Sequence, residues 1–201
     1  LAHPPYTKTH PHQLTPTGGA SKNPPPRGAA RAVSRHPALL EPFVSAHRVA
    51  GYFAVGGELD PAPLLALARQ QGKATYLPVI EGDSLQFAPV DDQTPWTTNR
   101  FGIPEPAVAP SRWLAPRDLD LVLTPLVAFD DQGQRLGMGG GFYDRSFSFL
   151  HPQSHPPVTP LLLGLAYEFQ RHRALICQPW DIPLAGVVTD VAVDGAILTS
   201  P

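Results

Sequence analysis

Residues 133–145, with the sequence GQRLGMGGGFYDR, combine clustered glycines with residues that can carry charge. Four of these glycines fall within residues 137–141. Glycine tolerates positive φ angles and leaves room beside the main chain, so successive N–H groups at the start of a helix can bind phosphate oxygens. The alternative is a glycine-rich turn without a ligand, because the spacing matches neither the P-loop nor the dinucleotide fingerprint in full.

Upstream of this loop, hydrophobic patterning predicts a β-α-β unit. Residues 48–55 and 73–80 have the composition of strands, and residues 61–71 have a helical pattern that starts at a proline and stops before Gly72. Parallel strands joined in this way cross over with a right hand. A helix broken or kinked at its prolines is predicted before this unit, at residues 31–44.

The rest of the chain predicts a larger sheet. Further strands are expected at residues 84–90, 119–129 (as one or two strands) and 161–167, with a helical segment at 142–150. Asp194-Gly195 lies between two β-type segments, residues 186–192 and 196–199, which predicts a hairpin turn. Together these elements predict an α/β fold, a single three-layer domain with a mixed, largely parallel sheet flanked by helices.

The overall composition limits the possible functions. With 42% hydrophobic and 16% charged residues, the 201 residues can bury one sizeable core, which excludes a fibre or a wholly disordered chain. A formal charge of -2 gives no cationic field for nucleic acid or an acidic membrane, and no apolar run approaches the roughly 20 residues that span a bilayer. The single Cys177 and the lack of an export signal favour the cytoplasm, and we expect a monomer.

Proline is unusually frequent, with 26 residues, and its distribution suggests a boundary. Residues 1–26 are rich in proline, contain the Gly18-Gly19 pair and follow neither a helical nor a strand period. We therefore expect a Pro-rich flexible N-terminal arm at residues 1–26 and a folded α/β domain at residues 27–201.

The loop sequence also resembles a known family. Residues 129–145, FDDQGQRLGMGGGFYDR, resemble the signature of 5-formyltetrahydrofolate cyclo-ligases, also called 5,10-methenyltetrahydrofolate synthetases. The resemblance covers roughly residues 46–190 and includes Tyr52-Phe53 and the segments 57–60, 99–106, 164–168 and 180–183. It implies an α/β fold with a mixed sheet. It also implies that ATP and Mg²⁺ drive cyclisation of 5-formyltetrahydrofolate to 5,10-methenyltetrahydrofolate, through a phosphorylated formyl oxygen and with release of ADP and phosphate.

The resemblance assigns roles to particular residues. Arg135 and Asp144 are implied to be catalytic, and Asp144 and Asp181 to bind Mg²⁺. The implied ATP loop consists of Arg135, Leu136, Gly137, Met138, Gly139, Gly140, Gly141, Phe142 and Tyr143. The implied folate-binding residues are Phe53, Glu58, Phe101, Met138, Gly139, Gly140, Gly141 and Phe142.

Each of these residues also has a simpler interpretation from its type alone. Arg135 could form a surface ion pair with Asp130 or Asp131, and Asp144 could be a carboxylate that stabilises a helix N-terminus. Phe53 would be a core residue, Glu58 a solvated loop charge, and Asp181 a turn residue.

One part of the family pattern is missing. Relatives begin with a basic helix containing Lys-x-x-x-Arg, whereas this region is rich in proline here. Arg27, Arg31 and Arg35 recur every four residues and could replace it, or could form a solvated basic face. The alternative function is therefore a folate-binding protein with impaired turnover. A third candidate is a phosphosugar or acyl-transfer enzyme, because similar folds host many reactions.

Overall fold

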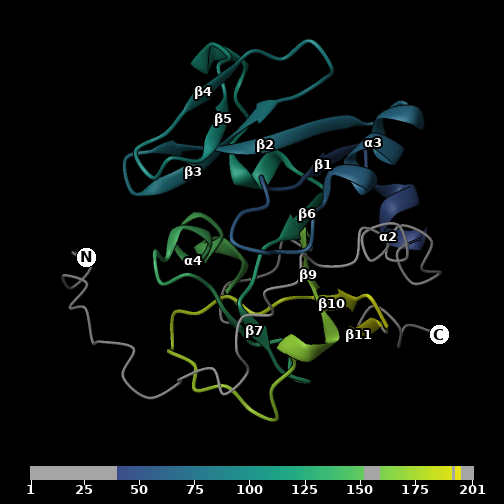
Figure 1. Cartoon of the computed structure of the whole chain (residues 1–201), viewed down its shortest axis with the longest axis vertical. Helices are drawn as coiled ribbons and strands as arrows, with labels where there is room; N and C mark the ends of the chain where they lie inside the picture. The colour runs from purple at the N-terminus through teal and green to yellow at the C-terminus, as the bar shows by residue number, and fades with distance from the viewer. Residues whose placement is uncertain (1–39, 152–158, 192, 196–201) are drawn as a thin grey trace.

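The computed structural model describes residues 40–151, 159–191 and 193–195 (Figure 1). The sequence predictions that lie wholly or partly outside these ranges are the arm at residues 1–26, the first part of the helix at 31–44, the arginines Arg27, Arg31 and Arg35, and the two C-terminal strands at 186–192 and 196–199. The domain start at residue 27 therefore stays a prediction. Among the described residues, no helix has both the length and the apolar character needed to cross a membrane.

The predicted β-α-β unit is present. β1 (Arg48–Ala50) pairs in parallel with β2 (Ala74–Glu81), and α3 (Ala62–Gln70) connects them. α3 starts after Pro61 and is followed by Gly72 with a φ of 77°, so proline and glycine occupy the positions that favour them. The short helix α2 (Leu40–Ser45) precedes β1.

β1 is shorter than the strand predicted at residues 48–55. The Gly51 N–H still donates to the Tyr76 carbonyl at 3.0 Å, but the chain then leaves the sheet. Tyr52 turns inward and its buried hydroxyl donates to the carbonyl of Leu59. This internal hydrogen bond holds residues 51–60 as a compact loop beyond the carboxyl end of β1.

Within the described residues, the main sheet has seven strands in the order β11-β10-β9-β6-β1-β2-β3. The five central strands are parallel, while β3 and β11 pair antiparallel with their neighbours. This arrangement confirms the mixed, largely parallel sheet. The additional strands are β3 (Ser84–Pro89), β6 (Leu121–Thr124), β9 (Leu161–Ala166), β10 (Gly186–Thr189) and β11 (Val193–Gly195).

The apolar run at residues 119–129 forms two separate strands. β6 ends at Thr124, and the next residue, Pro125, has no N–H to continue the ladder. β7 (Ala128–Phe129) then pairs antiparallel with β8 (Arg135–Leu136) in a small hairpin outside the main sheet.

The hairpin near the C-terminus has a different turn from the one predicted. Asp194 and Gly195 lie within β11, opposite Val187 and Gly186 of β10, so the Asp-Gly pair is not the turn. The chain reverses after Thr189 instead, where the Val191 N–H donates to the Thr189 hydroxyl at 3.2 Å. The strand predicted at residues 186–192 is present in part as β10, and the predicted position of the turn was wrong. The partner strand predicted at residues 196–199 lies outside the described residues.

Short elements complete the structure. The segment predicted to be helical at residues 142–150 divides into α4 (Phe142–Ser146) and the 3₁₀ turn η4 (Ser148–Leu150). The others are β4 (Trp96–Thr98) paired with β5 (Pro104–Pro106), and the 3₁₀ turns η2 (Pro110–Arg112), η3 (Pro116–Asp118) and η5 (Glu168–Gln170).

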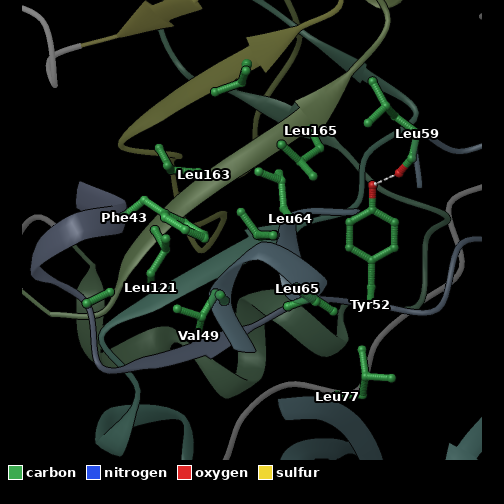
Figure 2. Close-up of a cluster of buried hydrophobic side chains, with 14 of the residues drawn as sticks. Phe43, Val49, Tyr52, Leu59, Leu64, Leu65, Leu77, Leu121, Leu163 and Leu165 are labelled. Carbon is green, nitrogen blue, oxygen red and sulfur yellow. Dashed lines mark hydrogen bonds between the residues drawn. The ribbon is translucent and has the colours of Figure 1, made fainter. Parts of the chain in front are cut away.

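The main sheet separates two hydrophobic cores, as expected for three layers. Side chains alternate along β6, so that Leu121 and Leu123 belong to one core and Val122 to the other. The first core contains residues of α2 and α3 and is shown in Figure 2. The second contains Phe147, which follows α4, together with residues from the loops around the predicted site.

Candidate active site

The candidate site lies where the order of strands reverses. After β1 the chain adds β2 on one side, and after β6 it adds β9 on the other, although β1 and β6 are neighbours. Ligands of open α/β sheets bind beyond the carboxyl ends of the strands at such a point. Residues 51–60 follow β1 there and residues 125–144 follow β6. They carry all the sequence-predicted site residues except Phe101 and Asp181.

The glycine loop, defined here as residues 136–141, connects β8 to α4. Gly139 and Gly141 have positive φ angles of 84° and 64°, and Gly141 is the N-cap of α4. Other residues rarely adopt this conformation, so both positions require glycine. The side chains of Leu136 and Met138 are 41% and 73% exposed, which leaves this loop accessible to a ligand.

Arg135 and Asp144 form an ion pair at the base of the glycine loop. The Arg135 Nη2 atom lies 2.7 Å from Asp144 Oδ1, and the two side chains are only 5% and 18% exposed. The same carboxylate oxygen accepts the Ile182 N–H at 3.2 Å. The Asp144 carboxylate therefore receives donors from two parts of the chain.

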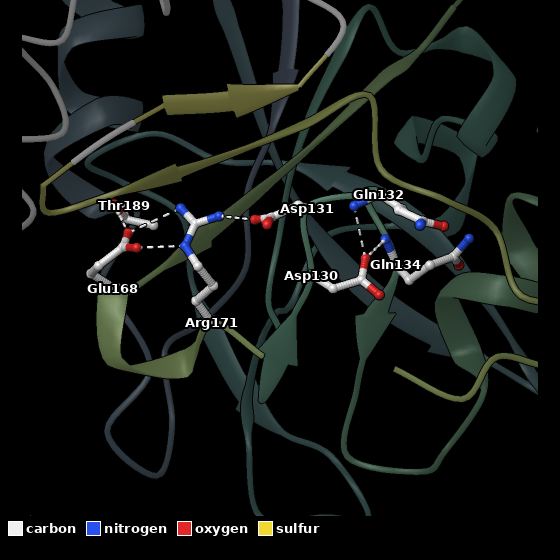
Figure 3. Close-up of polar contacts among 7 residues, drawn as sticks. All are labelled: Asp130, Asp131, Gln132, Gln134, Glu168, Arg171 and Thr189. Atoms are coloured by element: carbon white, nitrogen blue, oxygen red, sulfur yellow. Dashed lines mark hydrogen bonds and ion pairs between the residues drawn. The ribbon is translucent and has the colours of Figure 1, made fainter. Parts of the chain in front are cut away.

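Arg135 does not pair with Asp130 or Asp131, so that simple interpretation is wrong. Asp130 instead accepts the N–H groups of Gln132 and Gln134, each at 3.0 Å, and stabilises the turn between β7 and β8 (Figure 3). Asp131 forms an ion pair with Arg171. Both acidic residues hold the hairpin that presents Arg135.

Arg171 connects this hairpin to the ends of the parallel strands. It also forms an ion pair with Glu168, whose Oε2 accepts the Thr189 hydroxyl at 2.8 Å (Figure 3). The hydrogen bond from Arg171 holds the pKa of Glu168 below its ordinary value. The Arg171 guanidinium lies 4.8 Å from the centre of the Phe129 ring in β7. The network joins the carboxyl ends of β9 and β10 to β7 and to the turn of the β7–β8 hairpin.

Tyr143 packs against the Arg135 guanidinium. The Cζ of Arg135 is 5.6 Å from the centre of the Tyr143 ring, which stacks on Phe147 at 6.0 Å. The Tyr143 hydroxyl and Arg135 Nε are buried, and neither has a hydrogen-bond partner among the described residues. Since buried polar atoms are normally paired, these two unpaired atoms mark this part of the fold as a candidate ligand site.

Glu58 lies in a partly buried position near Tyr52 and Tyr143. Its Oε2 atom accepts the Val55 N–H at 3.0 Å, and burial raises the pKa of its carboxyl. The pKa of Tyr143 is also raised, mainly by burial, with a smaller contribution from the charge of Glu58. Glu58 is therefore not a fully solvated loop charge.

Asp181 lies near Asp144 and also closes a turn. Its Oδ2 accepts the Gln178 N–H at 2.8 Å, as expected for a turn residue. Burial raises its pKa, and the negative charge of Asp144 adds to this effect, so the two carboxylates are close enough to interact. The described residues contain no group of three or more His, Cys, Asp or Glu suited to a metal. Two carboxylates still suit Mg²⁺, which completes its coordination with water and phosphate oxygens.

Exposed aromatic rings form the remaining part of the site. Phe53 is 43% exposed, so it is not a core residue, and its ring centre lies 6.3 Å from that of Trp96. Phe101 is 57% exposed and lies edge-on to Phe142 at 5.9 Å. Three of the predicted apolar substrate residues thus occur in two aromatic pairs. Each pair joins one of the two loop segments at the candidate site, residues 51–60 or 125–144, to the region of β4 and β5.

Sequence reasoning missed two residues at this surface, Trp96 and Arg100. Trp96 faces Phe53, and the Arg100 guanidinium lies 5.2 Å from the ring centre of Phe101 and 6.0 Å from that of Phe142. Arg100 directly precedes Phe101 in the sequence, but its contact with Phe142 depends on the tertiary fold. No local pattern predicts that contact.

A shallow surface hollow of about 320 Å³ lies elsewhere. Its lining includes Arg69, Gly72 and Lys73 at the end of α3, and Ala74 at the start of β2. It contains none of the predicted site residues and lies at the amino end of the parallel strands. This hollow is therefore separate from the candidate active site.

Comparisons with known proteins agree with the sequence motifs. Residues 11–190 match the model of the 5-formyltetrahydrofolate cyclo-ligase family. A 5-formyltetrahydrofolate cyclo-ligase of Escherichia coli strain K12 is 42% identical over 151 residues, covering 74% of this chain and 80% of the relative. One from Haemophilus influenzae is 38% identical over 163 residues, covering 80% and 84%.

A solved structure also matches the fold. The NMR structure of the 5,10-methenyltetrahydrofolate synthetase of Aquifex aeolicus has a TM-score of 0.71 and 31% identity, with 87% of this chain and 84% of that chain covered. The match agrees with the mixed α/β sheet described above. The chain is an enzyme and belongs to the 5-formyltetrahydrofolate cyclo-ligase family.

Proposed function

We propose that this enzyme converts 5-formyltetrahydrofolate to 5,10-methenyltetrahydrofolate and couples the reaction to hydrolysis of ATP in the presence of Mg²⁺. The observation that best supports the proposal is the buried Arg135–Asp144 pair at the base of an exposed glycine loop. A cation and a carboxylate beside free main-chain N–H groups suit a Mg²⁺-nucleotide. The family assignment argues against a phosphosugar or acyl-transfer enzyme.

The proposed reaction needs activation of the formyl oxygen, which is a poor leaving group. Transfer of the γ-phosphoryl group of ATP to this oxygen releases ADP and makes it a phosphate ester. Nitrogen 10 of the folate then attacks the formyl carbon and loses its proton, a C–N bond forms, and the C–O bond breaks to release phosphate. The work of the enzyme is mainly to position the two substrates and to stabilise charge.

Arg135 and the two carboxylates account for the charge stabilisation. The Arg135 guanidinium is rigidly held by Asp144 and the Tyr143 ring, and its Nε has no hydrogen-bond partner among the described residues. The guanidinium therefore keeps donor groups for a phosphate oxygen. Asp144 and Asp181 would hold the metal ion. When bound, Mg²⁺ neutralises charge on the phosphate groups.

Glu58 and the aromatic rings account for folate binding in this proposal. An ionised Glu58 can accept paired hydrogen bonds from the amino-pyrimidine edge of the pterin. Phe53, Phe101, Phe142 and the exposed Met138 provide apolar surface for the rings of the substrate. In this proposal the buried charged residues bind Mg²⁺-ATP, and Glu58 with the exposed aromatic rings binds the folate.

Product formation tests the proposal directly. The purified enzyme is mixed with 5-formyltetrahydrofolate, and absorbance is followed in the band of the methenyl product. We expect product only when ATP and Mg²⁺ are both present. Folate binding without product under all conditions would contradict the proposal and favour the folate-binding protein with impaired turnover. Action as a cytoplasmic monomer stays a prediction.

A further inference from the structure

The turn between β4 and β5 is held rigidly by one asparagine. The Asn99 side-chain oxygen accepts the N–H groups of Phe101 and Ile103 at 2.9 and 3.0 Å, and its Nδ2 donates to Glu105 at 2.9 Å. Gly102 closes the turn with a φ of 76°. These contacts fix the directions of the residues that follow Asn99, among them Arg100.

The Arg100 guanidinium is exposed, but it has a defined position. It lies beside the Phe101–Phe142 pair, at 5.2 and 6.0 Å from the two ring centres, and Nη2 donates to the Gly82 carbonyl at 3.0 Å. Two ring faces and one carbonyl hold the group without neutralising its charge. The positive charge therefore remains available beside two exposed or partly exposed aromatic rings.

This combination matches one end of the proposed substrate. 5-Formyltetrahydrofolate carries a benzoyl ring joined to a glutamate, so an aromatic group is followed closely by carboxylates. Phe101 and Phe142 are already proposed to contact the folate. When the aromatic part of the folate lies against these two rings, the neighbouring carboxylates come close to the Arg100 guanidinium. A guanidinium is planar and can donate two hydrogen bonds to one carboxylate.

We propose that Arg100 binds the glutamate carboxylate of the folate and makes the enzyme selective for substrates that carry it. The inference rests on the proposed function, since it takes the folate as the ligand. A different anion at the same place, a phosphate group of ATP, would also suit a guanidinium. The two cases differ in which ligand loses affinity when Arg100 is removed.

The test compares two compounds and two variants by calorimetry. The compounds are 5-formyltetrahydrofolate and the methylamide of 5-formyltetrahydropteroate, which keeps the benzoyl amide but lacks both carboxylates of the glutamate. We expect Arg100→Gln to weaken binding of the first by about tenfold, as for loss of a partly exposed charge-assisted hydrogen bond, and to leave binding of the second unchanged. The affinity for ATP should also be unchanged.

Arg117→Gln provides the matched control. Arg117 is likewise an exposed arginine stacked on a phenylalanine, with its guanidinium 5.6 Å from the ring centre of Phe149, but it is not part of the proposed site. This variant should bind both compounds like the wild type. Thermal unfolding followed by circular dichroism verifies that both variants are folded.

The inference is overturned if Arg100→Gln weakens the binding of both compounds equally, weakens the binding of ATP alone, or changes no affinity. It is also overturned if the wild type binds the two compounds with equal affinity. Because binding is measured without turnover, these outcomes are independent of the absorbance test. The proposed function fails if no methenyl product forms, and this inference fails if the glutamate makes no contribution through Arg100.

Discussion

Arg135 and Asp144 close the glycine loop, because their ion pair of 2.7 Å joins the strand before the loop to the helix after it. Asp144 also accepts the Ile182 N–H, which brings the segment containing Asp181 to the same place. The two carboxylates and the guanidinium therefore lie close together although they come from three separate segments of the chain. This arrangement leads to predictions that distinguish binding roles from purely structural ones.

Replacement of Arg135 should weaken the binding of ATP far more than the binding of folate. We expect Arg135→Ala to weaken ATP binding by about 1.5–3 kcal/mol, or roughly ten- to a hundredfold, since a charge-assisted hydrogen bond to phosphate is lost. Calorimetry with each ligand measures the difference. Unchanged ATP affinity in a variant that is folded by circular dichroism would show that Arg135 serves only to pair with Asp144.

Asp144→Asn should raise the Mg²⁺ concentration needed for activity. The amide oxygen can still accept the Ile182 N–H, but the negative charge that attracts the metal is lost. Turnover is measured across a Mg²⁺ titration, with Asp120→Asn as a control because Asp120 accepts the N–H groups of His47 and Arg48 instead. If the Asp144 variant has the wild-type Mg²⁺ dependence, a structural role as a helix carboxylate is favoured.

Tyr143→Phe should separate ligand binding from stability. The buried hydroxyl has no partner among the described residues, so its removal should not destabilise the protein and could stabilise it by about 1 kcal/mol. The ring and its contact with Arg135 are retained. We expect weaker ATP binding with an equal or higher melting temperature. A variant with wild-type ATP affinity would indicate that the nucleotide does not use this hydroxyl.

Glu58→Gln should change the pH dependence of stability. Burial raises the pKa of Glu58, so the folded protein binds this proton more tightly than the unfolded chain does. The resulting stability is complete below the unfolded pKa and is lost as the pH rises through the higher folded pKa. The variant should therefore have a melting temperature similar to that of the wild type near pH 4 and a higher one at pH 8.

The same substitution should weaken folate binding at neutral pH, because glutamine lacks the charge that attracts the pterin donors. Parallel melting curves for wild type and variant at all pH values would contradict a buried, ionising Glu58. If the variant is more stable but binds folate with unchanged affinity, burial of the ionised Glu58 destabilises the fold and Glu58 does not contact the substrate.

The β-α-β unit and the buried strands could be predicted from the sequence because their signals are local. The helix pattern that ends at Gly72 and the apolar run before Pro125 depend only on neighbouring residues. The turn after β10 could not be predicted in this way. Thr189 and Asp190 bind Glu168 through its carboxylate and its N–H, and these long-range hydrogen bonds accompany the turn there despite the Asp-Gly signal.

The sequence suggests which residues belong to the candidate site, but it does not predict the contacts among them. The glycine loop sequence identifies Arg135 and Asp144, yet their pairing depends on how β8 and α4 meet across the loop. Arg100 lies in the family-like segment 99–106, but its position over Phe142 cannot be predicted from that segment, because it requires the turn after β4 to pack near α4. Tertiary packing therefore determines which charged residues meet, whereas local sequence determines which elements form.

Removal of residues 1–26 tests the boundary suggested by composition. A proline-rich segment without apolar periodicity contributes little packed surface, so we expect an unchanged melting temperature. We also expect near-equal turnover and ATP affinity, with Arg27, Arg31, Arg35 or other groups in the remaining chain providing charge for the phosphates. The family match begins at residue 11, within the deleted segment, so the two sequence signals disagree about this region.

The contrary outcome is a large loss of ATP affinity without loss of stability. It would mean that Lys8 or Lys22 contacts the nucleotide and becomes ordered when it binds. The full-length double variant Lys8→Ala, Lys22→Ala is the matched control, because it removes the two charges but keeps the chain. If both the deletion and the double variant bind ATP weakly, the basic group that relatives place on an N-terminal helix resides in this segment. If the deletion and the double variant both bind ATP with wild-type affinity, the basic group lies after residue 26.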